Sequence, residues 1–143
     1  MAEMVLDGSA TAGFFFTDEY TPQHGKLLED VLSDKVTLIQ PQLWRYECMN
    51  MIRTAVRRGR MTPALANKAM HHWSKIPATY AGPEFQMSRI LDLSLQHGLS
   101  AYDAAYLSLA ESLGAPLYAL DSDLLRLKPV FGWIVSMQEY PLG

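Results

Sequence analysis

Apolar and polar residues alternate in blocks along this chain, and the blocks predict strands that alternate with helices. Short apolar runs, typical of strands buried on both faces, occur at 4–6, 36–39, 117–120 and 133–137. Apolar residues recur at helical spacing in the segments 10–16, 23–32, 41–58, 62–75, 84–97, 102–113 and, for one turn, 124–127. The connection at 77–83 has room for one short edge strand. This order predicts an α/β fold with a parallel sheet, helices on both faces and right-handed crossovers.

Helix-start and helix-stop residues sharpen this picture in two places. Pro41 is expected to open the long helix that runs to about residue 58. Ser100, with Asp103 three residues later, is typical of a helix start, and Gly114 is typical of a helix stop. The strand that follows runs directly into Asp121. Because ligands of open α/β sheets bind outside the carboxyl ends of the strands, we expect a site there.

Length and composition indicate an ordinary globular protein. The 143 residues predict one domain, 1–143, and 49% of them are hydrophobic against 19% charged. We expect no membrane association, because no apolar run approaches the ~20 residues of a membrane span, and we also expect no secretion signal, because the first residues lead straight into a predicted strand. The single cysteine, Cys48, excludes an internal disulfide and is typical of a reducing compartment, so the expected location is the cytoplasm.

The formal net charge of −3 hides a basic segment at 41–75. Against one acid, Glu47, this segment carries seven basic residues: Arg45, Arg53, Arg57, Arg58, Arg60, Lys68 and Lys75. A basic segment on an acidic body favours a polyanion or an acidic protein as partner. The alternative is a helical hairpin whose exposed arginines are merely solvated.

Four acids stand at positions where packing alone does not require them. Asp7 and Asp121 end strands, Asp103 begins a helix, and Glu47 interrupts an apolar helical stripe. The three aspartates could instead serve as helix caps or first-turn acids. Glu47 could pair with Arg53 or with a neighbouring backbone group, because an unpaired buried carboxylate is costly. The sequence alone leaves these alternatives open.

If the four acids converge, their chemistry favours a hard divalent cation. Like charges at close range disfavour simultaneous ionisation, and a cation resolves that conflict. Mg²⁺ or Mn²⁺ prefers carboxylate oxygen and water, and the sequence offers no cysteine or histidine set that selects zinc. Such a cation activates water and stabilises charge on phosphate, so phosphodiester hydrolysis is the natural reaction class.

Three motifs now resemble a known family. VLDGSA at the start, Glu47-x-x-Asn50 and SAYDAAYLSLAESLGAPLYALDSDL are similar to PIN domains, and most closely to the VapC-type toxin ribonucleases of bacterial toxin–antitoxin pairs. The resemblance implies a three-layer α/β/α PIN-like fold and a Mg²⁺-dependent endoribonuclease. Its metal-binding and catalytic acids would be Asp7, Glu47, Asp103 and Asp121, with Mn²⁺ as the alternative ion.

The resemblance also implies partners. Family members are commonly homodimers that act on RNA and are inhibited by an antitoxin covering the site. Ser9 and Asn50 match accessory polar positions, and Asp123 is expected close to the acids. Two other functions are kept as alternatives: a PIN-like module that binds RNA or protein without catalysis, and a phosphoacceptor receiver domain. The receiver requires a lysine after the last core strand, and the sequence has none beyond Lys128.

Overall fold

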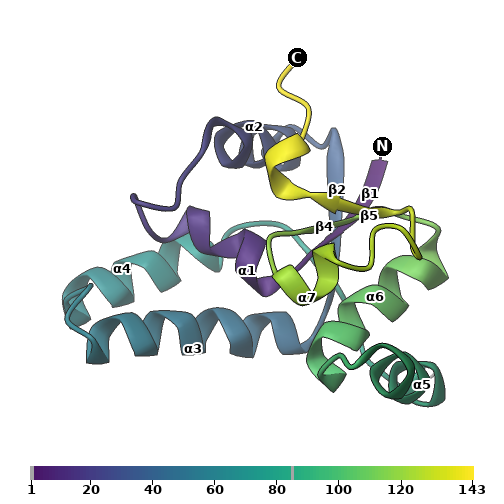
Figure 1. Ribbon diagram of the computed structural model, residues 1–143. Coiled ribbons are helices and arrows are strands. Elements are labelled where there is room, and N and C mark those ends of the chain that lie inside the picture. Colours follow the sequence, from purple (N-terminus) through teal and green to yellow (C-terminus); the bar gives the residue numbers. More distant parts are fainter. Residues whose placement is uncertain (1, 85) are drawn as a thin grey trace.

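A parallel sheet runs through the middle of the computed structural model, which describes residues 2–84 and 86–143 (Figure 1). In these residues the strands are β1 (Ala2–Leu6), β2 (Val36–Pro41), β3 (Thr79–Ala81), β4 (Leu117–Ala119) and β5 (Ile134–Ser136). They lie in the order β3-β2-β1-β4-β5, and every neighbouring pair is parallel. The predicted parallel sheet is confirmed, and β3 is the predicted edge strand.

Helices cover both faces of this sheet. They are α1 (Gly8–Thr11), the 3-10 helix η1 (Ala12–Phe14), α2 (Pro22–Leu32), α3 (Leu43–Arg57), α4 (Pro63–Trp73), α5 (Met87–His97), α6 (Ala101–Leu113), α7 (Ser122–Leu125) and the 3-10 helix η2 (Met137–Glu139). Helix α2 packs on β2 on one side, and α6, backed by α5, packs on β1, β2 and β4 on the other (Figure 1). The fold is therefore the expected three-layer α/β/α arrangement.

The strand order places a switch point between β1 and β4. From β1 the chain builds the sheet outward through β2 to β3, and it then crosses back to add β4 on the other side of β1. Ligands of open α/β sheets bind at such a point, outside the carboxyl ends of the strands. Receiver domains have the order 2-1-3-4-5 instead. The topology therefore argues against the receiver alternative.

The core is continuous across the sheet. Met4, Val5 and Leu6 of β1 are all buried, as expected for a central strand covered on both faces. Helix α6 is buried along residues 104–110 and forms the main layer beneath the sheet. It begins with the Asp103 backbone N–H donating to Ser100 Oγ and ends at Gly114 with φ of 62°, so both predicted boundary signals are confirmed.

Several predicted element boundaries differ from the structure, among them that of α7, which spans Ser122–Leu125 rather than 124–127. Pro41 ends β2, where it pairs with Ala81 of the short edge strand, and α3 begins only at Leu43. A proline is tolerated there because it is the last residue of β2 and lies beyond the residues that pair with β1. The segment 10–16 forms two short helices, α1 and η1, rather than one. Helix α5 begins at Met87 rather than residue 84, and Phe85, expected on its apolar face, lies outside the described residues. In the part of the chain that is described, no helix combines the length and apolarity needed to span a bilayer.

Candidate active site

Asp7 lies directly after β1, where a buried glutamine fixes the end of the strand. The Leu6 backbone N–H donates to Gln40 Oε1 at 2.8 Å, and Gln40 Nε2 donates to the Leu6 carbonyl at 2.7 Å. Asp7 is only 2% exposed. Its carboxylate accepts the Ala10 backbone N–H at 2.7 Å and the Ser9 hydroxyl at 2.8 Å. Asp7 therefore caps α1 while its carboxylate stays at the carboxyl edge of the sheet.

A short relay of hydrogen bonds positions α3 against this turn. The indole N–H of the fully buried Trp44 donates to Thr11 Oγ1 at 2.8 Å, and the Thr11 hydroxyl donates to the Asp7 carbonyl at 2.8 Å. Glu47 follows Trp44 by three residues and so lies on a neighbouring part of the same helix face. The relay therefore fixes the helix that carries Glu47 to the turn that carries Asp7.

Glu47 is half-buried, and its partner is a tyrosine. The Tyr106 hydroxyl, on α6, donates to Glu47 Oε1 at 2.5 Å, so the partner is a residue far along the chain rather than Arg53 or the backbone, the alternatives that the sequence left open. Burial raises the pKa of Glu47, the hydrogen bond from Tyr106 opposes that rise, and the charge of Asp121 adds to it. Burial and the Glu47 charge raise the pKa of Tyr106, so the phenol is a donor at neutral pH.

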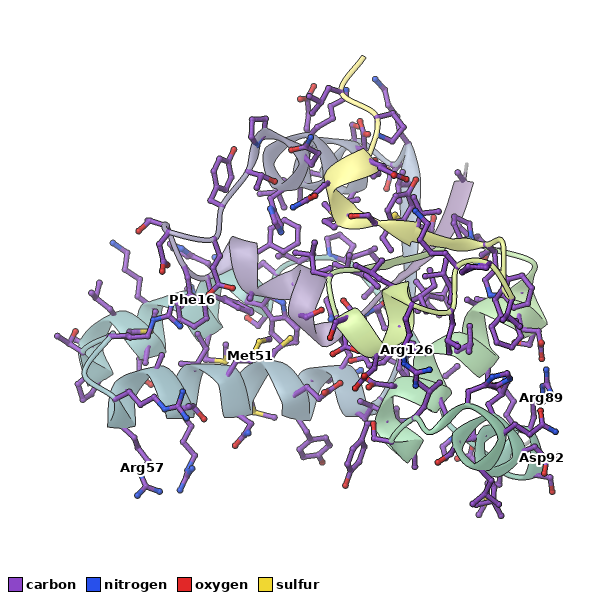
Figure 2. The ribbon with its side chains drawn as sticks, viewed as in Figure 1. Phe16, Met51, Arg57, Arg89, Asp92 and Arg126 are labelled. Carbon is purple, nitrogen blue, oxygen red and sulfur yellow. The ribbon has the colours of Figure 1, made fainter. Side chains whose placement is uncertain are left out.

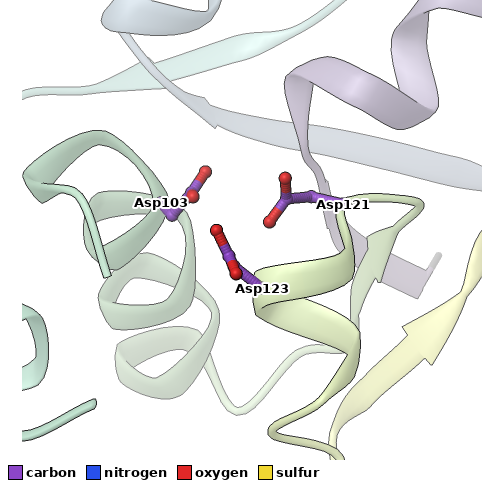
Figure 3. A group of neighbouring side chains, drawn as sticks. All are labelled: Asp103, Asp121 and Asp123. Carbon is purple, nitrogen blue, oxygen red and sulfur yellow. The ribbon is translucent and has the colours of Figure 1, made fainter. Parts of the chain in front are cut away.

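Asp103 and Asp121 are the other two predicted acids, and they come from α6 and from the end of β4. Asp103 lies in the first turn of α6. Asp121 follows β4 and caps α7, where its Oδ2 accepts the Leu124 backbone N–H at 3.1 Å. Figure 3 shows both carboxylates, together with that of Asp123, pointing toward one another. Each of these three residues offers a carboxylate oxygen within 4.8 Å of the others.

One cavity joins the predicted acids. It has a volume of about 310 Å³ and is lined by Asp7, Gly8, Ser9, Glu47, Asn50, Met51, Asp103 and Asp121. All four predicted acids and both accessory polar residues therefore reach the same cavity. The tightest carboxylate set, however, contains Asp123 in place of Asp7 and Glu47. Asp123 is exposed and also lies 3.7 Å from Arg126.

The cavity is strongly unfavourable for a full set of negative charges. Burial, together with the charge of Asp121, raises the pKa of Asp7 to about 7. Burial and the charges of Asp121 and Glu47 raise the pKa of Asp103 to about 6. The hydrogen bonds that Asp7 and Asp103 receive lower these values only in part. Oxygen donors of this kind fit a hard divalent cation, which would offset the repulsion.

Three positioning features were not anticipated from the sequence. Gln40, the Trp44–Thr11 pair and the Tyr106 hydroxyl hold the turn and the helices that carry the acids. Each is a polar group at a buried position, and such groups need partners. That rule could have flagged Gln40 and Tyr106 as residues with a specific partner, but only the structure identifies which partner each one has.

Comparison with known proteins agrees with this geometry. No family model matches the chain. Ribonuclease VapC3 of Pyrobaculum aerophilum is 30% identical over 129 residues, which cover 89% of this chain and 95% of that protein. The crystal structure of PAE2754, also from Pyrobaculum aerophilum, superposes with a TM-score of 0.70 at 23% identity, covering 96% of this chain and 92% of that one. The structural likeness supports the fold, and the sequence relationship supports the activity: the chain belongs to the VapC-type PIN-domain ribonucleases.

Proposed function

We propose that this ribonuclease is a Mg²⁺-dependent endoribonuclease and the toxin of a toxin–antitoxin pair. The observation that carries the first part is the convergence of Asp7, Glu47, Asp103 and Asp121, from separate elements, on one cavity at the topological switch point. All four would then act within one domain spanning residues 1–143. Mn²⁺, which takes the same oxygen ligands, is the expected substitute ion.

Each acid has a proposed role. Asp7, Asp103 and Asp121 would hold the ion directly or through water, and Glu47 would complete the cluster and orient the attacking water. A divalent cation bound there supplies a water nucleophile at neutral pH and stabilises charge on the phosphate. Ser9, which donates to Asp7 at 2.8 Å, would keep that carboxylate oriented. Asp123 would add negative charge at the rim of the cavity.

The direct test is RNA cleavage by the purified chain. After treatment with EDTA, we expect no cleavage of a structured RNA, and addition of Mg²⁺ or Mn²⁺ should restore it. Zn²⁺ should restore it poorly, because the donors are carboxylates. Gel analysis of an end-labelled RNA distinguishes internal cleavage from trimming. Intact RNA binding without cleavage under every metal condition would contradict the proposal and favour the non-catalytic binding module.

The RNA backbone is expected to contact the outer face of α3. Two basic residues of the segment 41–75 are already engaged: Arg45 lies 3.5 Å from the centre of the Tyr80 ring, and Arg60 pairs with Asp18 and Glu19. Arg57 and Arg58, at the end of α3, are exposed, and Arg57 projects away from the body of the protein (Figure 2). These two side chains are therefore available to a polyanion.

Replacing Arg57 and Arg58 with serine should weaken RNA binding in a salt-dependent way. The affinity for RNA falls as salt concentration rises, and each phosphate that the protein neutralises makes the slope of log affinity against log salt steeper by about 0.7–0.9. Losing two such contacts should therefore reduce the steepness of this slope by roughly one to two. The cleavage rate at saturating RNA should not change. Filter binding across a salt series measures this, with Lys35→Ser, just before β2 at the amino ends of the strands, as the control. An unchanged slope would leave α3 out of the RNA interface.

An apolar groove supports a protein partner. It has a volume of about 740 Å³, lies between η1, α2 and α4, and includes Phe14, Leu28, Leu65 and Trp73. Lys68 and Lys75 also line the groove, as does Arg60, which is paired with Asp18. Such a groove fits an amphipathic helix with acidic flanks, which is the chemistry we propose for the antitoxin. A neighbouring reading frame for a small DNA-binding protein would support this pairing.

A second apolar surface supports self-association. Met87, Leu91 and Leu95 lie four residues apart on α5 and are 66%, 57% and 74% exposed. This spacing puts them on one face of the helix, so together they form an apolar stripe. We propose that this stripe contributes to a homodimer.

The proposed location is the cytoplasm, where RNA is accessible and the buried Cys48 stays reduced.

A further inference from the structure

Tyr106 is buried among apolar side chains of α6, yet its hydroxyl reaches the acid cavity. The residue is 1% exposed, and its neighbours Ala105 and Leu107 are also buried. A phenylalanine would fill the same space without needing a polar partner. A buried phenol instead requires one, and the partner here is Glu47 Oε1 at 2.5 Å.

This hydrogen bond connects the two helices that carry site acids. Tyr106 lies on α6 three residues after Asp103, so the two side chains leave neighbouring positions on the helix. Glu47 lies on α3, 59 residues earlier in the chain. One helix therefore supplies Asp103 to the cavity and also holds Glu47 in place.

The backbone beside Asp7 confines the Glu47 carboxylate from another direction. A β-carbon added to Gly8 would lie 3.4 Å from Glu47 Oε1 and 3.5 Å from Oε2. Both carboxylate oxygens thus lie against the start of α1, while one of them accepts from Tyr106. The side chain is therefore contacted from two directions, although the charge of Asp121 opposes its ionisation.

We propose that Tyr106 is a positioning residue that fixes the Glu47 carboxylate in the orientation needed to hold the divalent cation. This inference rests on the proposed function. A hydroxyl that donates to an ionised carboxylate makes a short, strong hydrogen bond. This bond restricts rotation of the Glu47 carboxylate away from Asp121. Groups that orient metal-binding side chains typically contribute 10–100-fold to metal affinity or activity.

Tyr106→Phe tests this directly, because it removes the hydroxyl and keeps the ring. We expect the dissociation constant for Mn²⁺, measured by electron paramagnetic resonance without RNA, to rise about tenfold or more. At a fixed, subsaturating Mg²⁺ concentration kcat should fall by a similar factor, and KM for RNA should stay unchanged. A purely structural role would lower the melting temperature without this selective loss of metal affinity.

Tyr140→Phe is the matched control. The Tyr140 hydroxyl donates to Asp30 Oδ2 at 2.6 Å, in another buried tyrosine–carboxylate pair away from the acid cavity. Its removal should leave Mn²⁺ affinity at the wild-type value. In a Glu47→Ala background, Tyr106→Phe should cause no further loss of affinity, because its effect passes through Glu47. An equal loss in that background would overturn the inference.

Other outcomes separate this inference from the proposed function. If wild type binds Mn²⁺ and Tyr106→Phe binds it equally well, the positioning role is wrong and the metal site stands. If wild type neither binds Mn²⁺ nor cleaves RNA, both are wrong. Should Tyr106→Phe fail to fold, Glu47→Asp takes its place, since the shorter acid cannot reach the hydroxyl; wild-type Mn²⁺ affinity in that variant would overturn the inference.

Discussion

Asp7→Asn should melt roughly 10 °C above the wild type in metal-free buffer at about pH 8. In the folded protein, burial raises the pKa of Asp7 to about 7 from an ordinary 3.8. Ionising Asp7 therefore costs the folded state on the order of 4 kcal/mol. Asparagine avoids this cost and still caps α1, because its side-chain oxygen can accept the Ala10 N–H. In chains of this size about 1 kcal/mol corresponds to roughly 2–4 °C.

The sign of this effect follows from proton binding. Between the unfolded pKa and the folded pKa, Asp7 binds more protons in the folded state than in the unfolded state, so its contribution to stability falls as pH rises. The advantage of Asp7→Asn should therefore be fully present above about pH 7 and should vanish toward pH 4. Thermal unfolding in EDTA at these two pH values measures the difference.

Added Mg²⁺ should narrow the difference between the two melting temperatures. A cation that binds only the folded state stabilises it by mass action, so Mg²⁺ should raise the melting temperature of the wild type. The variant lacks one proposed ligand and should respond much less. If Asp7→Asn melts at or below the wild-type temperature in EDTA at about pH 8, Asp7 is not under electrostatic strain and this account of the cavity is wrong.

Asp103→Asn should lower the rate of RNA cleavage by at least about a hundredfold and leave the fold intact. The expected loss exceeds the 10–100-fold typical of groups that only orient a ligand, because Asp103 is one of the three acids proposed to hold the ion itself. Folding should survive because the α6 cap uses the backbone N–H of residue 103, which asparagine retains. Burial and like charges raise the pKa of Asp103 to about 6, so losing its charge should not destabilise the metal-free protein.

The comparison variant for Asp103→Asn is Asp92→Asn. Asp92 is an exposed acid on α5, and Figure 2 shows it on the outer side of that helix, so its replacement should leave cleavage unchanged. Single-turnover rates on one RNA at saturating Mg²⁺, with circular dichroism for the fold, complete the measurement. A folded Asp103→Asn protein that cleaves at the wild-type rate would remove Asp103 from the site.

Local signals made much of the fold predictable from the sequence. Capping residues such as Ser100, and the glycines after α5 and α6, act through their own backbone neighbours, so their effect can be read without tertiary structure. The same applies to the position of Asp7 and Asp121 at strand ends. Pro41 was the exception. It was predicted to begin a helix, but it pairs with the edge strand β3 instead.

Long-range features of the site were harder to predict. The order β3-β2-β1-β4-β5 puts Asp7 beside Asp121, and no local pattern encodes that order. The sequence marked Glu47 as an anomaly in an apolar stripe but could not identify Tyr106, 59 residues away, as its partner. A helix-capping role does not exclude a place in the acid cavity, since Asp7 and Asp121 each cap a helix and also line that cavity.

The most direct test of the central claim is to locate the ion. A crystal soaked in Mn²⁺ should give an anomalous difference peak within coordination distance of Asp103 and Asp121, in the cavity that Asp7 and Glu47 also line. The peak should be absent from crystals of Asp103→Asn. A peak elsewhere on the protein, or none in crystals of a protein that cleaves RNA in Mn²⁺, would contradict the claim that these carboxylates form the catalytic metal site.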